Sequence, residues 1–332
     1  MYIYLHILAN KIYNKKSDMQ TNMENKNRFI IFSTVIIVLI IISFSSLMIT
    51  ANDNISRDTN FRKINTNQNN YLSNKEENKK IRILIDPGHN AVTKGAVGFL
   101  GYEYYMTLRL ANQLTKILDK DDRFEYTLSR TGAYYDKHIK EYITNNYQKL
   151  LGIYNTELEE TERTGNLTRY QTIELYAIRH YAIDNNFDAL ISLHFDYMPY
   201  IKQREKTEGF HIIVSPYNGE FQTSMKIANK ISQRMQESYK ISPVIAIDNI
   251  LPNNVWKFYS KEDLLNKGIT LRGLVLLGDS FEYKYNKQTF KKDIPSVMIE
   301  SGFIHDWRLG STKELSNISD KIYNALVDVY CN

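Results

Sequence analysis

The chain has 332 residues with 43% hydrophobic residues, enough for an ordinary buried core, and its length predicts one or two domains of the usual size of roughly 150 residues. The formal charge of +5 is modest and partly N-terminal, which excludes the basic footprint of a nucleic-acid-binding protein. The single cysteine, Cys331, excludes a disulfide within the chain, so the fold has to depend on its core.

Three segments without a globular pattern come first. Residues 29–50 form an uncharged apolar run, long enough at about 1.5 Å per residue to cross a hydrocarbon layer of roughly 30 Å. Residues 1–28 hold more Lys and Arg than Asp and Glu, so the positive-inside rule places them in the cytoplasm. Residues 51–80 are polar and Asn-rich, as in flexible linkers. We therefore expect a single-pass protein of the cell membrane with one extracytoplasmic domain at 81–332.

The apolar run could instead be a signal peptide that is removed from the mature protein. A cleaved signal peptide would give a secreted protein, but the run is longer than the 7–15 residues typical of such peptides, and no clear A-x-A cleavage site follows it. Met23 is an alternative start of the protein, in which case residues 1–22 have no function. The anchor remains the preferred interpretation.

From Ile81 onward, apolar runs of strand length alternate with amphipathic stretches of helical length. The expected strands are 81–85, 124–128, 189–193, 210–214, 274–277 and 296–299. The expected helices are 102–118, 168–185, 224–239 and 313–329, whereas 241–268 is expected to be irregular. This alternation predicts a single layered α/β domain, in which helices flank a twisted sheet that is mostly parallel or mixed.

Residues that can bind a metal or move a proton follow several of these strands. His89 and His194 each come directly after an apolar run, and Glu300 ends the last one. Because ligands bind at the carboxyl ends of strands in open α/β sheets, we expect these side chains at one edge, joined by Glu103 from the next helix. Two imidazoles and one carboxylate make a catalytic zinc shell with a position left for water. A further carboxylate nearby can take the proton of that water.

Four motifs, in this order, carry a resemblance to a known family. They are Asp-Pro-Gly-His ending at His89, Glu103 at a helix start, Ser-Leu-His ending at His194, and Ile-Glu-Ser-Gly-Phe-Ile around Glu300. Over essentially all of residues 81–332 the sequence resembles the zinc-dependent N-acetylmuramoyl-L-alanine amidases of catalytic type 3. The resemblance implies that His89, Glu103 and His194 bind zinc and that Glu300 is the catalytic carboxylate.

The reaction that the resemblance implies is hydrolysis of an amide in bacterial peptidoglycan. The bond joins the lactyl group of N-acetylmuramic acid to the L-alanine of the stem peptide. Zinc would polarise the lactyl carbonyl, and Glu300 would pass a proton to the leaving nitrogen. The resemblance implies peptidoglycan as the substrate. The apolar run at 29–50 adds the membrane as a partner, and the modest charge predicts no nucleic acid.

Three more residues are candidates for contact with the substrate or for support of the metal ligands. Asp86 either orients the first histidine or closes the turn after the first strand, and the turn is the expected role. Asp196 stands where the family usually has Asn, which adds a negative charge beside the metal. Arg272 either touches the substrate or forms an ion pair. His211 and His305 lie near the motifs, and packing is the expected role of both.

The connection between Arg130 and Ala189 is longer than usual in the family, which predicts an insertion at 134–168. In some amidases of this type an extra helix in this region blocks the zinc until a partner removes it. The insertion is therefore either a site for a regulatory partner or a plain elaboration of the surface, and the second is expected.

Two other functions remain open for the same fold. The first is an inactive homologue that binds the wall or a partner, against which the presence of all four active-site residues argues. The second is a zinc peptidase that acts within the stem peptide. Only the identity of the cleaved bond separates it from an amidase.

Overall fold

The computed structural model describes residues 79–159, 167–198, 208–243, 258–278 and 292–332. The predicted cytoplasmic segment at 1–28, the apolar run at 29–50 and all but the last two residues of the linker at 51–80 lie outside these ranges. Within the described ranges, no helix combines the length and the apolar character that a bilayer span requires.

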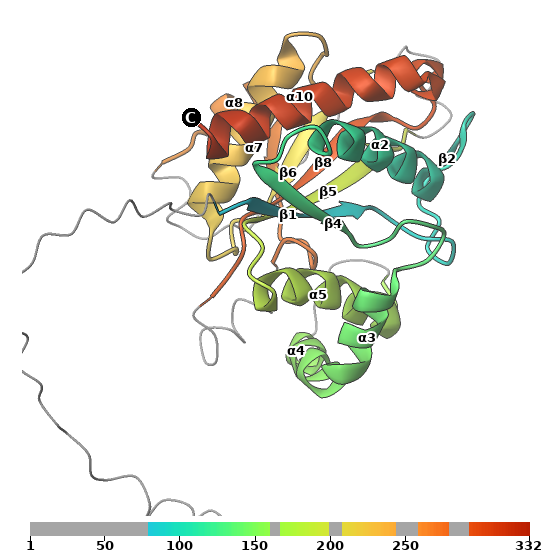
Figure 1. The fold of residues 1–332 in the computed structure, drawn as a ribbon, viewed down its shortest axis with the longest axis vertical. Helices are drawn as coiled ribbons and strands as arrows, with labels where there is room; N and C mark the ends of the chain where they lie inside the picture. The colour runs from blue at the N-terminus through green and yellow to red at the C-terminus, as the bar shows by residue number, and fades with distance from the viewer. Residues whose placement is uncertain (1–78, 160–166, 199–207, 244–257, 279–291) are drawn as a thin grey trace, which may run out of the picture. The chain divides into compact units, whose positions relative to one another are not determined.

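A six-stranded mixed sheet forms the centre of the domain, in the order β4-β1-β5-β8-β6-β7 (Figure 1). Its strands are β1 (Ile81–Pro87), β4 (Phe124–Leu128), β5 (Ala189–Asp196), β6 (His211–Val214), β7 (Ile269–Leu271) and β8 (Ser296–Phe303). Strands β4, β1, β5 and β8 run parallel, whereas β6 is antiparallel to β8 and parallel to β7. The predicted mixed sheet in a single α/β domain is confirmed. A separate two-stranded ribbon joins β2 (Val97–Gly98) to β3 (Gly101–Tyr102).

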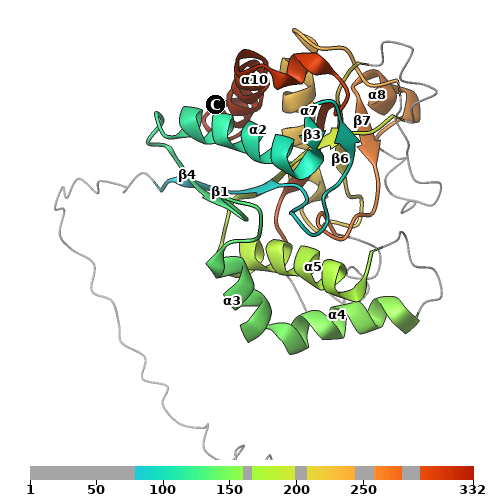
Figure 2. The same cartoon turned by 90° about the vertical axis from the view of Figure 1, so that its right-hand side faces the viewer.

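Helices cover both faces of the sheet, as Figures 1 and 2 show from two directions. One face carries α2 (Glu103–Leu118), α7 (Phe221–Gln236) and α10 (Thr312–Tyr330). The opposite face carries α3 (Lys137–Asn145), α4 (Tyr147–Glu159) and α5 (Arg169–Asp184). The short helix α8 (Lys261–Asn266) and the 3₁₀ turn η2 (Trp307–Gly310) lie in connections.

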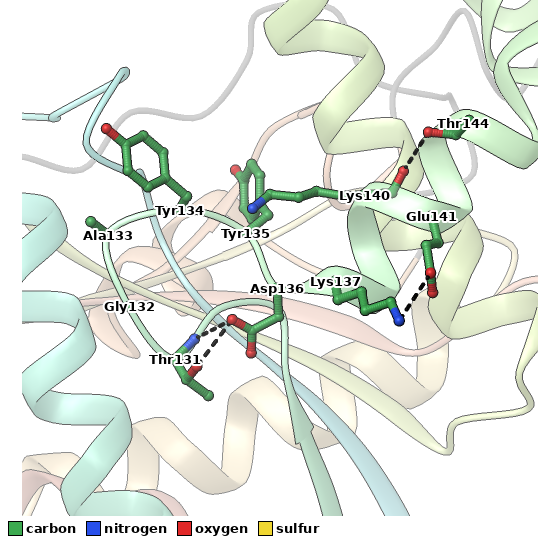
Figure 3. A pocket seen from close by; sticks show the side chains of 10 residues that line it. All are labelled: Thr131, Gly132, Ala133, Tyr134, Tyr135, Asp136, Lys137, Lys140, Glu141 and Thr144. Atoms are coloured by element: carbon green, nitrogen blue, oxygen red, sulfur yellow. Dashed lines mark hydrogen bonds and ion pairs between the residues drawn. The ribbon is translucent and has the colours of Figure 1, made fainter.

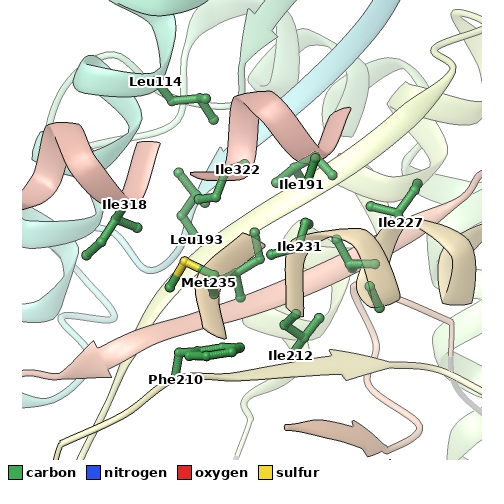
Figure 4. Close-up of a cluster of buried hydrophobic side chains, with 14 of the residues drawn as sticks. Leu114, Ile191, Leu193, Phe210, Ile212, Ile227, Ile231, Met235, Ile318 and Ile322 are labelled. Atoms are coloured by element: carbon green, nitrogen blue, oxygen red, sulfur yellow. The ribbon is translucent and has the colours of Figure 1, made fainter. Parts of the chain in front are cut away.

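Two hydrophobic cores result, because alternate side chains of a strand point to opposite faces. In β1, Ile83 and Ile85 belong to the core under α2, α7 and α10, whereas Leu84 belongs to the core under α3 to α5. Figure 4 shows the first core, where Ile191 and Leu193 of β5 lie among side chains of the covering helices. Burial on both faces explains why the central strands are almost uninterrupted apolar runs.

Two expectations for the region before β8 are wrong. Residues 274–277 form a buried turn, in which the Leu277 amide donates to the Leu274 carbonyl over 2.9 Å, and the strand lies earlier, at Ile269–Leu271. The turn is apolar because it closes the core under α5. A buried turn and a buried strand are both short apolar runs, so the sequence pattern does not distinguish them. The stretch 241–268 was expected to be irregular, but Lys261–Asn266 forms a helix. The Ser260 hydroxyl caps this helix by accepting from the Asp263 amide over 3.1 Å. Residues 244–257 lie outside the described ranges.

The stretch predicted as an insertion at 134–168 contains α3 and α4, and residues 160–166 lie outside the described ranges. Ile139 of α3 and Leu150 and Ile153 of α4 are fully buried together with side chains of α5. The two helices therefore extend the core on this face of the sheet. Its status as an insertion stays a prediction.

Replacement of Ile191 by Ala is expected to lower the free energy of unfolding by about 2–5 kcal/mol, since it leaves a cavity in a closely packed core. Ile191 has no exposed surface and pairs with Ile85 and Val297 in the neighbouring strands. Urea denaturation measures the change. Val92→Ala is the control, because Val92 is 73% exposed and its truncation leaves stability nearly unchanged.

Candidate metal centre and active-site pocket

Three side chains that are distant in the sequence meet at the carboxyl end of the central strands. His89, Glu103 and His194 each offer one ligand atom within 4.8 Å of the others. The Glu103 carboxylate lies between the two imidazoles, with Oε2 3.1 Å from Nε2 of His89 and Oε1 3.0 Å from Nδ1 of His194. The structure thus brings together all three residues that the sequence predicts as ligands.

The donor set and its spacing fit a divalent metal. Bonds of about 2.0–2.1 Å in a tetrahedral arrangement place ligand atoms roughly 3.3 Å apart. Each imidazole nitrogen lies 3.0 or 3.1 Å from one of the two Glu103 oxygens, close to that value, and one ligand atom of each residue lies within 4.8 Å of the others. Two nitrogens and one oxygen are also the donors that zinc accepts in catalytic sites.

The turn after β1 brings the two histidines together. The Gly88 amide donates to the Leu193 carbonyl over 2.9 Å, which joins the end of β1 to the end of β5. His89 adopts a left-handed backbone with a φ of 62°, a conformation that costs a non-glycine residue about 1–2 kcal/mol. A Cβ on Gly88 would lie 2.2 Å from Nε2 of His194, so only glycine leaves room for that imidazole. The Asp-Pro-Gly-His motif therefore has a steric reason for its glycine.

Glu103 is the first residue of α2 and is almost completely buried. Its carboxylate accepts from the Ala96 amide over 2.9 Å and from the Phe195 amide over 3.2 Å. Burial opposes ionisation, but hydrogen bonds with His194 and His89 outweigh it and hold the pKa of Glu103 below its usual range. The backbone just before β2 packs closely against this carboxylate. A Cβ on Gly95, whose φ is +70°, would lie 2.5 Å from Oε2 of Glu103. The group is thus held as a carboxylate in one orientation.

Glu300 lies on β8, paired in register with His194 of β5 on one side and His211 of β6 on the other. Its Oε2 atom is buried and has no hydrogen-bond partner among the described residues. Burial first, and then the negative charges of Glu103 and Asp196, raise the pKa of Glu300 well above its ordinary value. A raised pKa makes the Glu300 carboxylate a stronger base than an ordinary one, which suits a group that takes up and returns protons.

Asp196 and His211 form a second polar pair beside Glu300. The sheet register shifts between His194 and Asp196, a bulge that turns the end of β5. Oδ2 of Asp196 lies 3.7 Å from Nδ1 of His211. Burial, aided by the charge of Arg272, lowers the pKa of His211 to about 4, so this imidazole is neutral at pH 7. His211 is therefore a buried neutral group, whereas the charge of Asp196 adds to burial and to the charge of Glu103 in raising the pKa of Glu300.

Asp86 lines the same pocket as the two histidines, but its hydrogen bonds go elsewhere, and His305 does not line that pocket. Asp86 is buried and accepts from the Ser129 hydroxyl over 2.5 Å and from the Ser192 hydroxyl over 3.0 Å. No hydrogen bond joins it to His89 within the described part of the chain. Asp86 thus ties β1 to β5 and to the segment after β4. His305 follows β8, with its ring 5.5 Å from that of Phe303.

Sequence reasoning left the role of Arg130 open. Its side chain is fully buried, and it donates to the carbonyls of Pro87, Gly88, Tyr104 and Gly132 over 2.6 to 3.0 Å. It thereby fastens the turn that carries one metal ligand to the first turn of α2, which carries another. No local pattern in the sequence indicated these contacts.

A pocket of about 440 Å³ opens beside the metal ligands. His89 and His194 line it on the sheet side, and Gln171, Glu174 and Leu175 line it from α5. Arg272 and the turn that follows it complete the wall. Arg272 thus lines the pocket, and the choice between substrate contact and an ion pair stays open. The structure also adds Glu174, for which the sequence offered no signal beyond its helix.

A second, shallower hollow of about 560 Å³ lies nearby and is shown in Figure 3. One continuous stretch, 131–144, lines it with mixed charges, and Lys137 pairs with Glu141 across 3.5 Å. It contains none of the predicted site residues. Tyr135 lines both concavities and separates them.

The chain is similar to several known proteins and matches one protein family. A stretch of 57 residues, 17% of this chain, is 46% identical to the probable N-acetylmuramoyl-L-alanine amidase AmiB of Haemophilus influenzae, and spans 13% of that relative's length. Among solved structures, AmiC2 of Nostoc punctiforme has a TM-score of 0.46 at 15% identity, over 76% of this chain and 99% of that one. The CwlD amidase from Clostridioides difficile, solved with the GerS lipoprotein, gives the same values. The family described as N-acetylmuramoyl-L-alanine amidase matches residues 83–328, about three quarters of the chain, and the chain therefore belongs to that family.

Proposed function

We propose that the chain is a zinc-dependent hydrolase that cuts the amide between the lactyl group of N-acetylmuramic acid and the L-alanine of the stem peptide. The observation that carries the proposal is the cluster of His89, Glu103 and His194, in which both histidines line a pocket, in a chain that belongs to the amidase family. The cluster supplies two nitrogens and one ionised oxygen to a metal, and the pocket supplies room for the substrate.

The residues divide the work as follows. His89, Glu103 and His194 would hold the zinc, which would supply Lewis-acid chemistry that polarises a carbonyl and lowers the pKa of a bound water to about 7. Glu300 takes the proton of the attacking water and returns it to the alanine nitrogen as that nitrogen leaves. Arg272 lines the pocket and supplies a positive charge to carboxylates of the stem peptide.

Removal of the metal is expected to abolish hydrolysis, and zinc is expected to restore it where magnesium does not, because imidazole ligands suit zinc and magnesium prefers oxygen. The protein is treated with a chelator, and release of dye from labelled peptidoglycan is measured before and after the addition of each metal. His194→Ala should lose both zinc and activity. His138→Ala is the matched control, because His138 lies on α3 and lines neither concavity.

The products identify the bond. Mass spectrometry of amidase products shows a free lactyl carboxylate on the glycan and a new N-terminal alanine on the peptide. Fragments cut within the stem peptide would instead assign a zinc peptidase. A protein that binds wall, holds no zinc and releases nothing would be an inactive homologue.

The proposal includes a location and a regulatory partner. Residues 29–50 anchor the protein in the cell membrane with the catalytic domain outside the cytoplasm. Support comes from the apolar run and the positive charges before it. A regulatory partner that acts on 134–168 would reach the pocket, because Tyr135 and Leu167, near the two ends of that segment, both line it. Protease accessibility in intact spheroplasts, before and after detergent, tests the orientation.

A further inference from the structure

Glu174 lies in the wall of the pocket, on a different element from the metal ligands. It sits in the second turn of α5, and Gln171, Glu174 and Leu175 all line the pocket. Residues three and four positions apart share one face of a helix, so this face of α5 is the one that borders the pocket. The pocket therefore contains a carboxylate besides those of the metal centre.

The charge of Glu174 is uncompensated within the described part of the chain. Its side chain is half-buried, and its hydrogen-bond partner is the neutral phenol of Tyr170. Asp184 at the end of the same helix, in contrast, pairs with Lys149 over 2.9 Å. Burial raises the pKa of Glu174 to about 7, whereas the hydrogen bond with Tyr170 lowers it only in part. A half-buried carboxylate without a cation is unfavourable for the folded protein, and such groups gather at binding sites.

We infer that Glu174 binds the protonated side-chain amine of the diamino acid in the stem peptide, and thereby favours stems in which that amine is free. The inference rests on the proposed function. In an intact wall fragment the sugar amines are acetylated and the alanine nitrogen is part of the amide to be cut. The side-chain amine of the third stem residue is then the primary cation that the substrate can offer to a carboxylate.

The rest of the pocket matches the other parts of such a peptide. Arg272 supplies a positive charge for stem carboxylates, and Leu175, Leu276 and Met298 supply apolar surface. Cross-linking acylates the amine of an acceptor stem, which removes its positive charge. Glu174 therefore makes the enzyme discriminate between free and cross-linked acceptor stems.

The test compares Glu174→Gln with the unaltered full chain, both loaded with zinc, on two muramoyl-tripeptides. One carries a free side-chain amine and the other carries the same amine acetylated. A charge-assisted hydrogen bond predicts a KM about 10-fold to 100-fold lower for the free amine with the unaltered protein. This difference should disappear in Glu174→Gln, for which the KM values of the two substrates should be similar. Glu262→Gln, in the exposed first turn of α8, is the matched control and should behave as the unaltered protein.

Binding of the stem tripeptide alone, measured by calorimetry, keeps this inference separate from the proposed function. Tighter binding of the free-amine peptide, lost in Glu174→Gln, supports the contact even in a protein that cleaves nothing. Equal affinity for both peptides overturns it. A loss of zinc from Glu174→Gln also overturns it, because Glu174 would then act on the metal. Preference only for a de-N-acetylated sugar would assign the carboxylate to the glycan and overturn it as well.

Discussion

Replacement of Glu300 by Gln is expected to lower the rate of peptidoglycan hydrolysis by about 100-fold to 10,000-fold, the usual contribution of a positioned proton-transfer group. The physical reason is the position of the side chain: Glu300 pairs in register with the metal ligand His194, and its Oε2 atom is buried without a hydrogen-bond partner among the described residues. Gln keeps the volume and removes the group that takes up the proton. Dye release from labelled wall measures the rate.

Zinc content and stability separate loss of the proton-transfer group from loss of the site. Glu300 is outside the cluster of three ligands, so the variant should hold one zinc per chain. A buried carboxylate without a partner is unfavourable in the folded state, so its replacement should leave the free energy of unfolding unchanged or raise it. Full turnover by Glu300→Gln would remove the catalytic assignment, and loss of zinc would make Glu300 part of the metal centre.

Replacement of Gly88 by Ala is expected to weaken zinc binding by at least about 100-fold, more than loss of a group that only supports a ligand. The new Cβ would lie 2.2 Å from Nε2 of His194. The obstructed atoms belong to the end of a side chain, so the imidazole turns away and the backbone stays in place. The fold should survive while one of the three ligands is lost. Competition with a chelating dye measures the zinc affinity, and circular dichroism checks the fold.

Gly132→Ala is the matched control for this experiment. No atom lies within 4 Å of a Cβ built on Gly132, although Gly132 also contacts Arg130 through its carbonyl. Its replacement should leave zinc affinity and activity at their original values. Unaltered zinc affinity in Gly88→Ala would show that the His194 imidazole is not where the metal binds.

The proposed amine contact and the catalytic group use carboxylates with the same property. Burial raises the pKa of both Glu174 and Glu300. Their partners differ, since Glu300 is surrounded by the charges of the metal centre, whereas Glu174 has a phenol. The first environment suits proton transfer, and the second suits capture of a cation from the substrate.

The sequence by itself determined the layered α/β architecture and the four residues proposed for metal binding and catalysis. Buried parallel strands are continuous apolar runs, which local patterns reveal. His194 and Glu300 lie in the carboxyl halves of two such strands, and the resemblance of the surrounding motifs to the amidase family supplied the roles. The motif that ends at His89 also contains Gly88, which has to be glycine because the imidazole of His194 packs against it.

Only the tertiary structure decided which of the remaining residues face the site. The run Leu274–Leu277 is as apolar as a strand, yet it closes a core as a turn, because burial does not distinguish the two. Arg130 is a buried clamp and Glu174 faces the pocket, and both roles depend on elements that lie far away in the chain. Contacts between distant segments are set by how the helices pack on the sheet, which no local pattern of residues contains.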